Sequence, residues 1–444
     1  MMWARARELM GSSRLFGSAV ITQAVLSLGN LLLGMALIRA STEEDYGRYV
    51  LGYTLLALAI AVPNAALFGP QAILCGKLDA DARRRWVSRV SQQLARGCLV
   101  GCAAVAVLMG LLPGLLLHRW EDALLGASVA VAAAVSIRRE HFRAVLYLSR
   151  LPTEVLKSDA VYAAVAVALT VALATLVPGH AAPWVMLGLA LAAGLGAWRA
   201  HRTIGERLGW APDDGQNRIA SLWPLGRWAL LGSMINWSFV QGFYFVMVAL
   251  IDVRAVAAVA ATRLLLMPVN LLSTGVGQLL LPMAAGWFAT LGGAVVLRRL
   301  TLIAAGLLGL TLLYTAVLWL LQGWIMGTVL GREFDDQSTL IAAWATCFAI
   351  GVVRTTIARA AMVVERFKAL SGLEAITAVV SLGVGSWAMM QFGAVGGIVG
   401  LIAGEAVGLV LMAGYLGLLR RQGVLGAAPL QTFTVEHIHH QPAW

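Results

Sequence analysis

Twelve long apolar runs, separated by short segments that carry most of the charge, constrain this chain more than any other feature of its sequence. Each run is long enough to cross about 30 Å of hydrocarbon as a helix, which takes roughly 20 residues. Helices satisfy their own backbone hydrogen bonds in lipid, and these runs are too long and too uniformly apolar for barrel strands. We therefore expect an all-α, polytopic membrane protein with about twelve transmembrane helices. The runs lie at about residues 16–38, 48–70, 95–117, 121–138, 158–177, 182–198, 228–250, 257–283, 301–321, 338–360, 370–391 and 394–418.

The charges between the runs test this count. If the N-terminus is cytoplasmic, 27 of the 33 basic residues fall on segments predicted to face the cytoplasm. The other six fall on or near outside segments that also carry acidic residues. An error of one span would reverse half of these assignments, so the positive-inside rule supports twelve spans with both termini in the cytoplasm. The six exceptions are Arg39, Arg48, Arg119, Arg254, Arg263 and Arg332.

The longest polar stretch, at about residues 199–227, divides six spans from six. It predicts an N-terminal six-helix bundle over 1–198, a cytoplasmic linker over 199–227, and a C-terminal six-helix bundle over 228–420. Residues 421–444 then form a cytoplasmic tail that we expect to be disordered. Two halves that both start inside imply parallel repeats with a cavity between them.

The composition excludes several classes of function. The chain is 60% hydrophobic and 12% charged, whereas a soluble domain carries about 25% charged residues. Its net charge of +11 is scattered between the apolar runs, without the stripe or aromatic-interleaved patch of a nucleic-acid surface. No clustered carboxylates or Cys/His set predicts a metal site, and His437, His439 and His440 are interpreted as part of the tail. We expect no cofactor and no nucleic-acid partner.

An enzyme is also disfavoured. Membrane-embedded polymerases and ligases usually expose a sizeable polar catalytic loop, and here no predicted outside loop exceeds about 16 residues. The spacing of Asp79 and Asp81 resembles a metal-binding DxD motif, but a solvated turn is the favoured interpretation. Transport without covalent chemistry is the better class.

Two short motifs then suggest a family. The first apolar run ends in Leu37-Ile-Arg-Ala-Ser-Thr-Glu-Glu-Asp-Tyr-Gly-Arg-Tyr49, and the eighth contains Ala260-Ala-Thr-Arg-Leu-Leu-Leu-Met-Pro268 followed by Leu280-Leu-Pro282. Both resemble the polysaccharide flippases (Wzx-like) of the multidrug/oligosaccharidyl-lipid/polysaccharide exporter superfamily. That family often has Leu-x-Pro-Glu-Glu-Tyr-Gly at the first position; here Ser41-Thr42 replaces the proline, and one residue more precedes Tyr46.

This resemblance implies a MATE-like arrangement of two six-helix bundles that open alternately around a cationic cavity. It implies that the protein flips an undecaprenyl-pyrophosphate-linked oligosaccharide across a bacterial plasma membrane, for surface or exopolysaccharide biosynthesis. Membrane lipids and the polysaccharide polymerase or chain-length machinery are the expected partners. A MATE-type multidrug/cation antiporter is the alternative within the superfamily, and a membrane-embedded polysaccharide polymerase or ligase is the alternative from another class.

Charged residues within the spans are the candidate site, because charge in hydrocarbon usually marks a pathway or a buried pair. Arg263, about two turns into the eighth span, and Arg354, about two turns from the inner end of the tenth, can bind a pyrophosphate through forked hydrogen bonds. Glu405, near the middle of the twelfth span, is either an ion-coupling site that exchanges a proton or the partner of an arginine in the same half. Asp159, which follows Ser158 near the start of the fifth span, is interpreted as a helix cap.

Amide side chains complete the candidate set. They lie in the spans that would line a cavity between two halves, and they can bind sugar hydroxyls or neighbouring helices. The substrate-binding candidates among them are Asn64, Asn236, Gln241 and Asn270.

Overall fold

In a computed structural model, residues 2–75, 78–108, 120–177, 179–212, 215 and 218–425 are described, and every regular element among them is helical. The first part of the chain forms α1 (Met2–Ala40), α2 (Glu43–Pro63), the π-helix η1 (Asn64–Phe68), α3 (Gly69–Cys75), α4 (Ala80–Ala106), α6 (Trp120–Leu148), α7 (Pro152–Leu176) and α8 (Ala181–Arg207). The second part forms α9 (Arg218–Gln241), α10 (Phe243–Leu250), α11 (Val253–Leu265), α12 (Met267–Leu291), α13 (Gly293–Trp324), the π-helix η3 (Ile325–Leu330), α14 (Gln337–Val363), α15 (Phe367–Phe392) and α16 (Ala394–Arg421).

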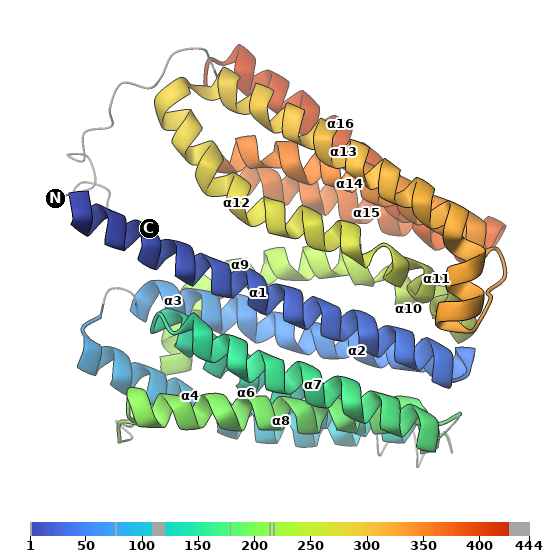
Figure 1. Ribbon diagram of the computed structural model, residues 1–444, viewed down its shortest axis with the longest axis horizontal. Coiled ribbons are helices and arrows are strands. Elements are labelled where there is room, and N and C mark those ends of the chain that lie inside the picture. The colour runs from blue at the N-terminus through green and yellow to red at the C-terminus, as the bar shows by residue number, and fades with distance from the viewer. Residues whose placement is uncertain are drawn as a thin grey trace.

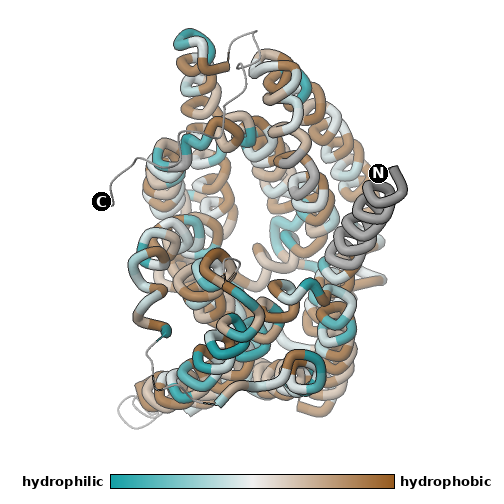
Figure 2. The backbone as a smooth tube through the Cα atoms, turned by 90° about the vertical axis from the view of Figure 1, so that its left-hand side faces the viewer, coloured by the Kyte–Doolittle hydropathy of each residue, from teal (hydrophilic) through white to brown (hydrophobic). Residues whose placement is uncertain are grey.

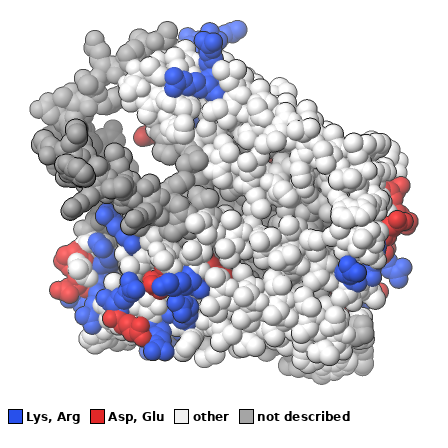
Figure 3. Space-filling view, viewed as in Figure 1, with Lys and Arg blue, Asp and Glu red and all other residues white. Residues whose placement is uncertain are grey.

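The all-α, multi-pass prediction is confirmed. Among the described residues, nine helices are long and apolar enough to cross a membrane, or eleven if each of two bent pairs is one span. The remaining predicted span, 95–117, begins in α4 and ends among residues 109–119, which are not described. Figure 3 shows a broad band without charge between charged residues at the two ends of the molecule. Seen from the end that carries the N-terminus, hydrophobic residues recur along most of the coloured helices, and hydrophilic residues are denser in the lower part of the view (Figure 2).

Several helices extend beyond the predicted spans, because hydropathy detects only their apolar part. Most of the predicted linker at 199–227 is helical, since α8 continues to Arg207 and α9 begins at Arg218. The predicted tail, with its three histidines, lies outside the described residues from residue 426 onward. The division into two bundles and the orientation of the termini stay predictions.

The chain bends where its sequence interrupts a helix. Between α9 and α10 the axis turns by 45° at Gly242, and between α11 and α12 it turns by 55° at Leu266. Pro268 lies in the first turn of α12, where its missing N–H removes no helical hydrogen bond. Hydropathy predicts one span at 228–250 and one at 257–283. In the structure each of these spans is divided between two helices.

The helices pack in a recurring way (Figure 1). In one group α8 packs against both α6 and α7, and in the other α16 packs against both α14 and α15. The groups meet where α2 packs on α11 and where α9 packs on η1. Glycine allows both crossings: a Cβ atom at Gly47 would lie 2.1 Å from the Val253 carbonyl oxygen, and one at Gly226 would lie 2.0 Å from that of Ala66.

The polar turn in the first family motif stabilises the fold rather than a site. Thr42 caps α2 by accepting a hydrogen bond from the Asp45 backbone N–H. The buried Asp45 carboxylate accepts hydrogen bonds from the backbone N–H groups of Ala181 and Ala182, at 2.7 and 2.9 Å, and so caps α8. The helix dipole favours a negative charge at this position.

The two arginines that flank this turn have different partners. Arg48 pairs with Glu44 and Glu121, and Arg39 donates to the carbonyl oxygens of Thr328 and Val329 in η3. Arg48 therefore links the motif to the start of α6, whereas Arg39 links α1 to η3.

Candidate functional site

A cavity of about 530 Å³ lies among α9, α11, α12, α14 and α16. Aromatic and aliphatic side chains form part of its wall, and the amides of two predicted residues lie on it. Three arginines and one carboxylate give the wall a positive formal balance. The charged and amide residues that line it are Asn236, Arg263, Asn270, Arg354, Arg359 and Glu405.

A second cavity, of about 370 Å³, lies between α1 and α2 on one side and α9 to α12 on the other. Three of its tyrosines, Tyr46, Tyr49 and Tyr53, follow one face of α2 with successive ring centroids 6.3 and 5.8 Å apart. Gln241 lines this cavity alone, whereas Arg263 and Asn270 line both cavities. Arg263 and Asn270 therefore lie where the two spaces adjoin.

Arg263 occupies this junction at the end of α11, just before the 55° bend. Its Nη1 lies 3.4 Å from the Gln241 Oε1 and 3.4 Å from the Tyr244 hydroxyl. Its guanidinium carbon lies 5.2 Å from the centroid of the Trp344 ring, and Trp344 is held by a 3.0 Å hydrogen bond to the Val259 carbonyl oxygen. In the part of the chain that the structure describes, Arg263 has no ion pair, so its charge is offset only by neutral groups.

Arg354 is engaged by two carboxylates. Its Nε lies 2.6 Å from one Glu405 oxygen and its Nη2 3.2 Å from the other, which is a forked pair. Its Nη1 lies 2.5 Å from Glu374 on α15, and its guanidinium carbon lies 5.8 Å from the Phe239 ring centroid. Arg354 is buried, at 7% side-chain exposure, and Glu405 is nearly so. Both line the first cavity, as a pair.

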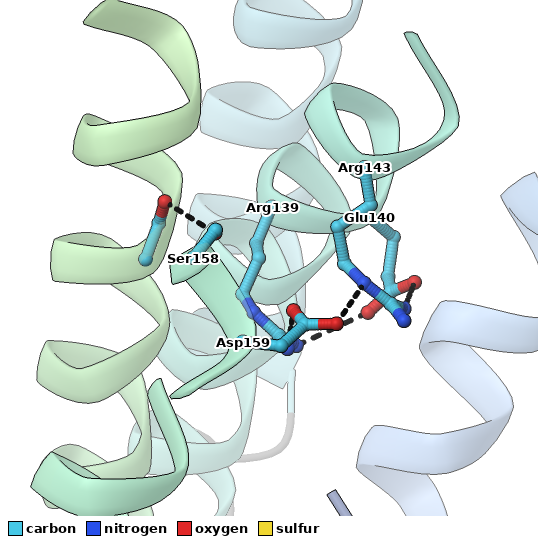
Figure 4. A network of polar contacts seen from close by, with 6 residues as sticks. Arg139, Glu140, Arg143, Ser158 and Asp159 are labelled. Carbon is cyan, nitrogen blue, oxygen red and sulfur yellow. Dashed lines mark hydrogen bonds and ion pairs between the residues drawn. The ribbon is translucent and has the colours of Figure 1, made fainter. Parts of the chain in front are cut away.

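A similar cluster on α6 and α7 was not anticipated as an ion-pair site (Figure 4). Asp159 is completely buried and binds Arg139 at 2.6 Å and Arg143 at 2.9 Å. Glu140 pairs with the same two arginines, at 3.1 and 2.5 Å. The interpretation of Asp159 as a helix cap is wrong, because α7 begins at Pro152 and Asp159 lies inside the helix.

The other residues predicted from the sequence fall into two groups, those that line a cavity and those that do not. The structure brings Asn236, Gln241 and Asn270 to the two cavities with Arg263. Asn64 begins η1, is exposed, and lies on neither cavity.

The tyrosines of α2 were not predicted as site residues. Their spacing of three and four residues is visible in the sequence and places them on one face of a helix. Asp79, of the DxD-like pair, caps α4 by accepting from the Ala82 N–H at 2.7 Å.

Comparison by sequence gives no match, either to a family model or to a curated protein. Comparison by structure does. The lipid II flippase MurJ, in an inward closed conformation, superposes with a TM-score of 0.68 at 12% identity, covering 91% of this chain and 87% of that one. An inward-facing multidrug resistance MATE family transporter of the MOP superfamily superposes at 0.67 and 12% identity, covering 91% and 98%.

This chain has the fold of the MOP transporters. A third match is the MATE multidrug transporter DinF-BH, at a TM-score of 0.59 and 12% identity, covering 93% of this chain and 95% of that one. The outward-facing form of a MATE family transporter superposes at 0.56, below the inward-facing form. The MATE-like fold implied by the two motifs is the one observed, and the solved structures named here are of a flippase and of multidrug transporters.

Proposed function

We propose that the protein flips an undecaprenyl-pyrophosphate-linked oligosaccharide across a bacterial inner membrane by alternating access. The observation that carries the proposal is Arg263, a cation without an ion pair in the described structure, on the wall of two adjoining cavities. An anionic headgroup supplies the missing partner, and in a cavity of low dielectric such a pair is stronger than in water. The MOP fold supports transport as the class of function.

The charge on the wall favours an anion over a cation. Arg359 also lines the first cavity, is half-buried, and has no acidic partner among the described residues. Glu405, the carboxylate on that wall, is committed to Arg354. A pyrophosphate can therefore bind Arg263 directly, whereas it would reach Arg354 only by competing with Glu405 and Glu374.

The second cavity supports the oligosaccharide part of the proposal. Sugar rings present apolar C–H faces and a rim of hydroxyls, which suit aromatic faces and amide groups respectively. The tyrosine face of α2 provides the first, and Gln241, Asn270 and Asn30 provide the second. The headgroup on Arg263 would place the first sugars against these residues.

A MATE-type multidrug or cation antiporter is the second candidate, favoured by the carboxylate and the aromatic residues on the wall of the first cavity. The two functions differ in the sign of the charge that is transported. Replacement of Arg263 by alanine weakens binding of an anion and strengthens binding of a cation, so one variant separates them.

The test uses proteoliposomes with a fluorescent sugar-pyrophosphate-lipid and a quencher that reaches only the outer leaflet. A hydrogen bond to a charged group contributes about 1.5–3 kcal/mol. Since 1.36 kcal/mol is tenfold, we expect Arg263→Ala to slow flipping roughly 10- to 150-fold, with Arg263→Lys intermediate. Arg254→Ala, which removes an exposed charge from the start of the same helix, is the matched control. Flipping by Arg263→Ala at the wild-type rate, or transport of a cationic rhodamine dye with no flipping by the wild type, contradicts the proposal.

A further inference from the structure

A groove of about 270 Å³ lies along the pair formed by α6 and α8, and its lining shares no residue with the two cavities described above. Val135, Gly194 and Ala197 line its apolar end. Arg138 and His201 line its polar end, and both are exposed. The groove is thus amphipathic along its length.

The depth of the groove follows from helix geometry. Arg138 is 18 residues beyond Trp120, the start of α6, and His201 is 20 residues beyond Ala181, the start of α8. At 1.5 Å per residue these distances are about 27 and 30 Å, close to the thickness of the hydrocarbon layer. The polar end therefore lies at one membrane interface, predicted to be the cytoplasmic one, and the apolar end extends into the same leaflet.

Arg138 stands apart from the arginines around it. Five arginines at the same ends of α6 and α8 form ion pairs with carboxylates, at 2.5 to 3.9 Å: Arg139, Arg143, Arg199, Arg202 and Arg207. Arg138 has no such pair within the described ranges, and its guanidinium carbon lies 5.9 Å from the Phe142 ring centroid. His201 stacks on Trp210, with centroids 4.8 Å apart, and lies at 61° to the Phe142 ring. The nitrogens of the imidazole are the groups that can donate to a phosphate.

We propose that this groove binds an anionic phospholipid of the cytoplasmic leaflet. The phosphate pairs with Arg138 and accepts a hydrogen bond from His201, while an acyl chain lies along Val135, Gly194 and Ala197. Trp198, on the rim and 62% exposed, has the amphipathic ring that is typical of the headgroup level. Basic pockets between helices at this interface are suited to anionic headgroups, and the apolar end distinguishes a lipid from free phosphate.

The test is native mass spectrometry of the full-length protein in mild detergent, titrated with phosphatidylglycerol or with phosphatidylcholine of the same chains. The wild type is expected to retain phosphatidylglycerol at least tenfold more tightly. Arg138→Gln is expected to lose this preference, whereas Arg85→Gln, which removes an exposed charge from α4 outside the groove, keeps it. Equal binding of the two lipids by the wild type, or an unchanged preference in Arg138→Gln, overturns the proposal.

A second variant tests the apolar end of the groove. It keeps the proposal testable even if Arg138→Gln fails to fold. Gly194→Leu fills the groove, since a Cβ atom there lies 3.6 Å from Val135 and meets no other atom within 4 Å. We expect it to release phosphatidylglycerol while Arg138 is intact. Competition with glycerol phosphate distinguishes a lipid from a free phosphate as the ligand. If glycerol phosphate displaces the lipid at equal concentration, the groove recognises a phosphate group alone and the lipid proposal is wrong. The proposal is also wrong if Gly194→Leu binds the lipid normally.

Discussion

The two buried ion-pair clusters have the same plan and different surroundings. In each, an arginine on one helix binds a carboxylate 20 residues later on the next: Arg139 with Asp159, and Arg354 with Glu374. In each, a glycine of a third helix lies beside the arginine, Gly196 in α8 and Gly408 in α16. The two clusters thus lie in corresponding places within the two three-helix groups that pack alike, α6–α8 and α14–α16.

The clusters differ in charge balance and in access. Arg139, Arg143, Asp159 and Glu140 sum to zero and line none of the cavities described above. Arg354 has two carboxylates, so its cluster carries one negative charge in excess when fully ionised, and Glu405 lies on the wall of the 530 Å³ cavity. The first cluster links α6 to α7. The second has two carboxylates for one arginine, and it borders a cavity.

The largest effect is expected from breaking the closed cluster. Asp159→Asn leaves two arginines buried with Glu140 as their remaining acidic partner, and removal of one member of a buried pair typically costs about 3–5 kcal/mol. We expect a large loss of folded protein, measured as monodisperse yield and thermal unfolding in detergent. Glu206→Gln, which breaks the Arg202 pair at 60–65% exposure, is the control and should change stability by less than about 1 kcal/mol. A well-folded Asp159→Asn protein would mean that this cluster does not hold α6 to α7.

The open cluster should give a smaller loss of stability and a change in transport. Glu405→Gln keeps Glu374 on Arg354, so the expected loss is that of a hydrogen bond to a charged group, about 1.5–3 kcal/mol. If Glu405 is the coupling site, a proton gradient imposed across proteoliposomes accelerates flipping by the wild type and not by this variant. Glu374→Gln, which removes the other carboxylate of the same arginine, is the matched comparison. Equal acceleration of Glu405→Gln and wild type would exclude Glu405 as the coupling group.

Much of the fold was predictable because the bilayer imposes it. The length of an apolar run is a local property, and it identified every helix that the structure shows to be long and apolar enough to span. The bends at Gly242 and Leu266 were not predicted, because mean hydropathy does not report the direction of a helix. The extent of α6 was underestimated, although Phe142, Val145 and Leu146 continue an apolar helical face beyond the predicted end at residue 138.

The candidate site was predictable only as a set of residues. Rare charges within apolar runs identified Arg263, Arg354 and Glu405, and all three line one cavity. The pairing of Glu405 with an arginine in the same half was one of the two interpretations offered by the sequence, and the structure has it. The sequence did not say which arginine, because Arg354 and Glu405 are 51 residues apart. The same limit hid the Arg139 cluster, since its arginines were assigned to a cytoplasmic loop, where charge needs no explanation.

The smallest effect is expected from substitution of the two glycines that lie beside the cluster arginines. A Cβ atom at Gly196 would lie 3.3 Å from the Ser158 carbonyl oxygen and 3.4 Å from the Arg139 Cδ. At Gly408 it would lie 2.9 Å from both the Arg354 Cδ and the Thr377 Oγ1. Alanine is favoured over glycine inside a helix by up to about 1 kcal/mol, which offsets a mild contact but not a displaced ion pair.

We therefore expect Gly196→Ala to leave thermal unfolding within about 1 kcal/mol of the wild type, the size of that helical preference. Gly408→Ala should instead move the Arg354 side chain, lower transport severalfold and leave most of the protein folded. Transport and thermal unfolding measured on the same preparations separate the two outcomes. If both alanine variants transport normally, the Arg354 side chain can be displaced without loss of function. The Arg354 cluster would then not differ from the buried Arg139 cluster in the way proposed here.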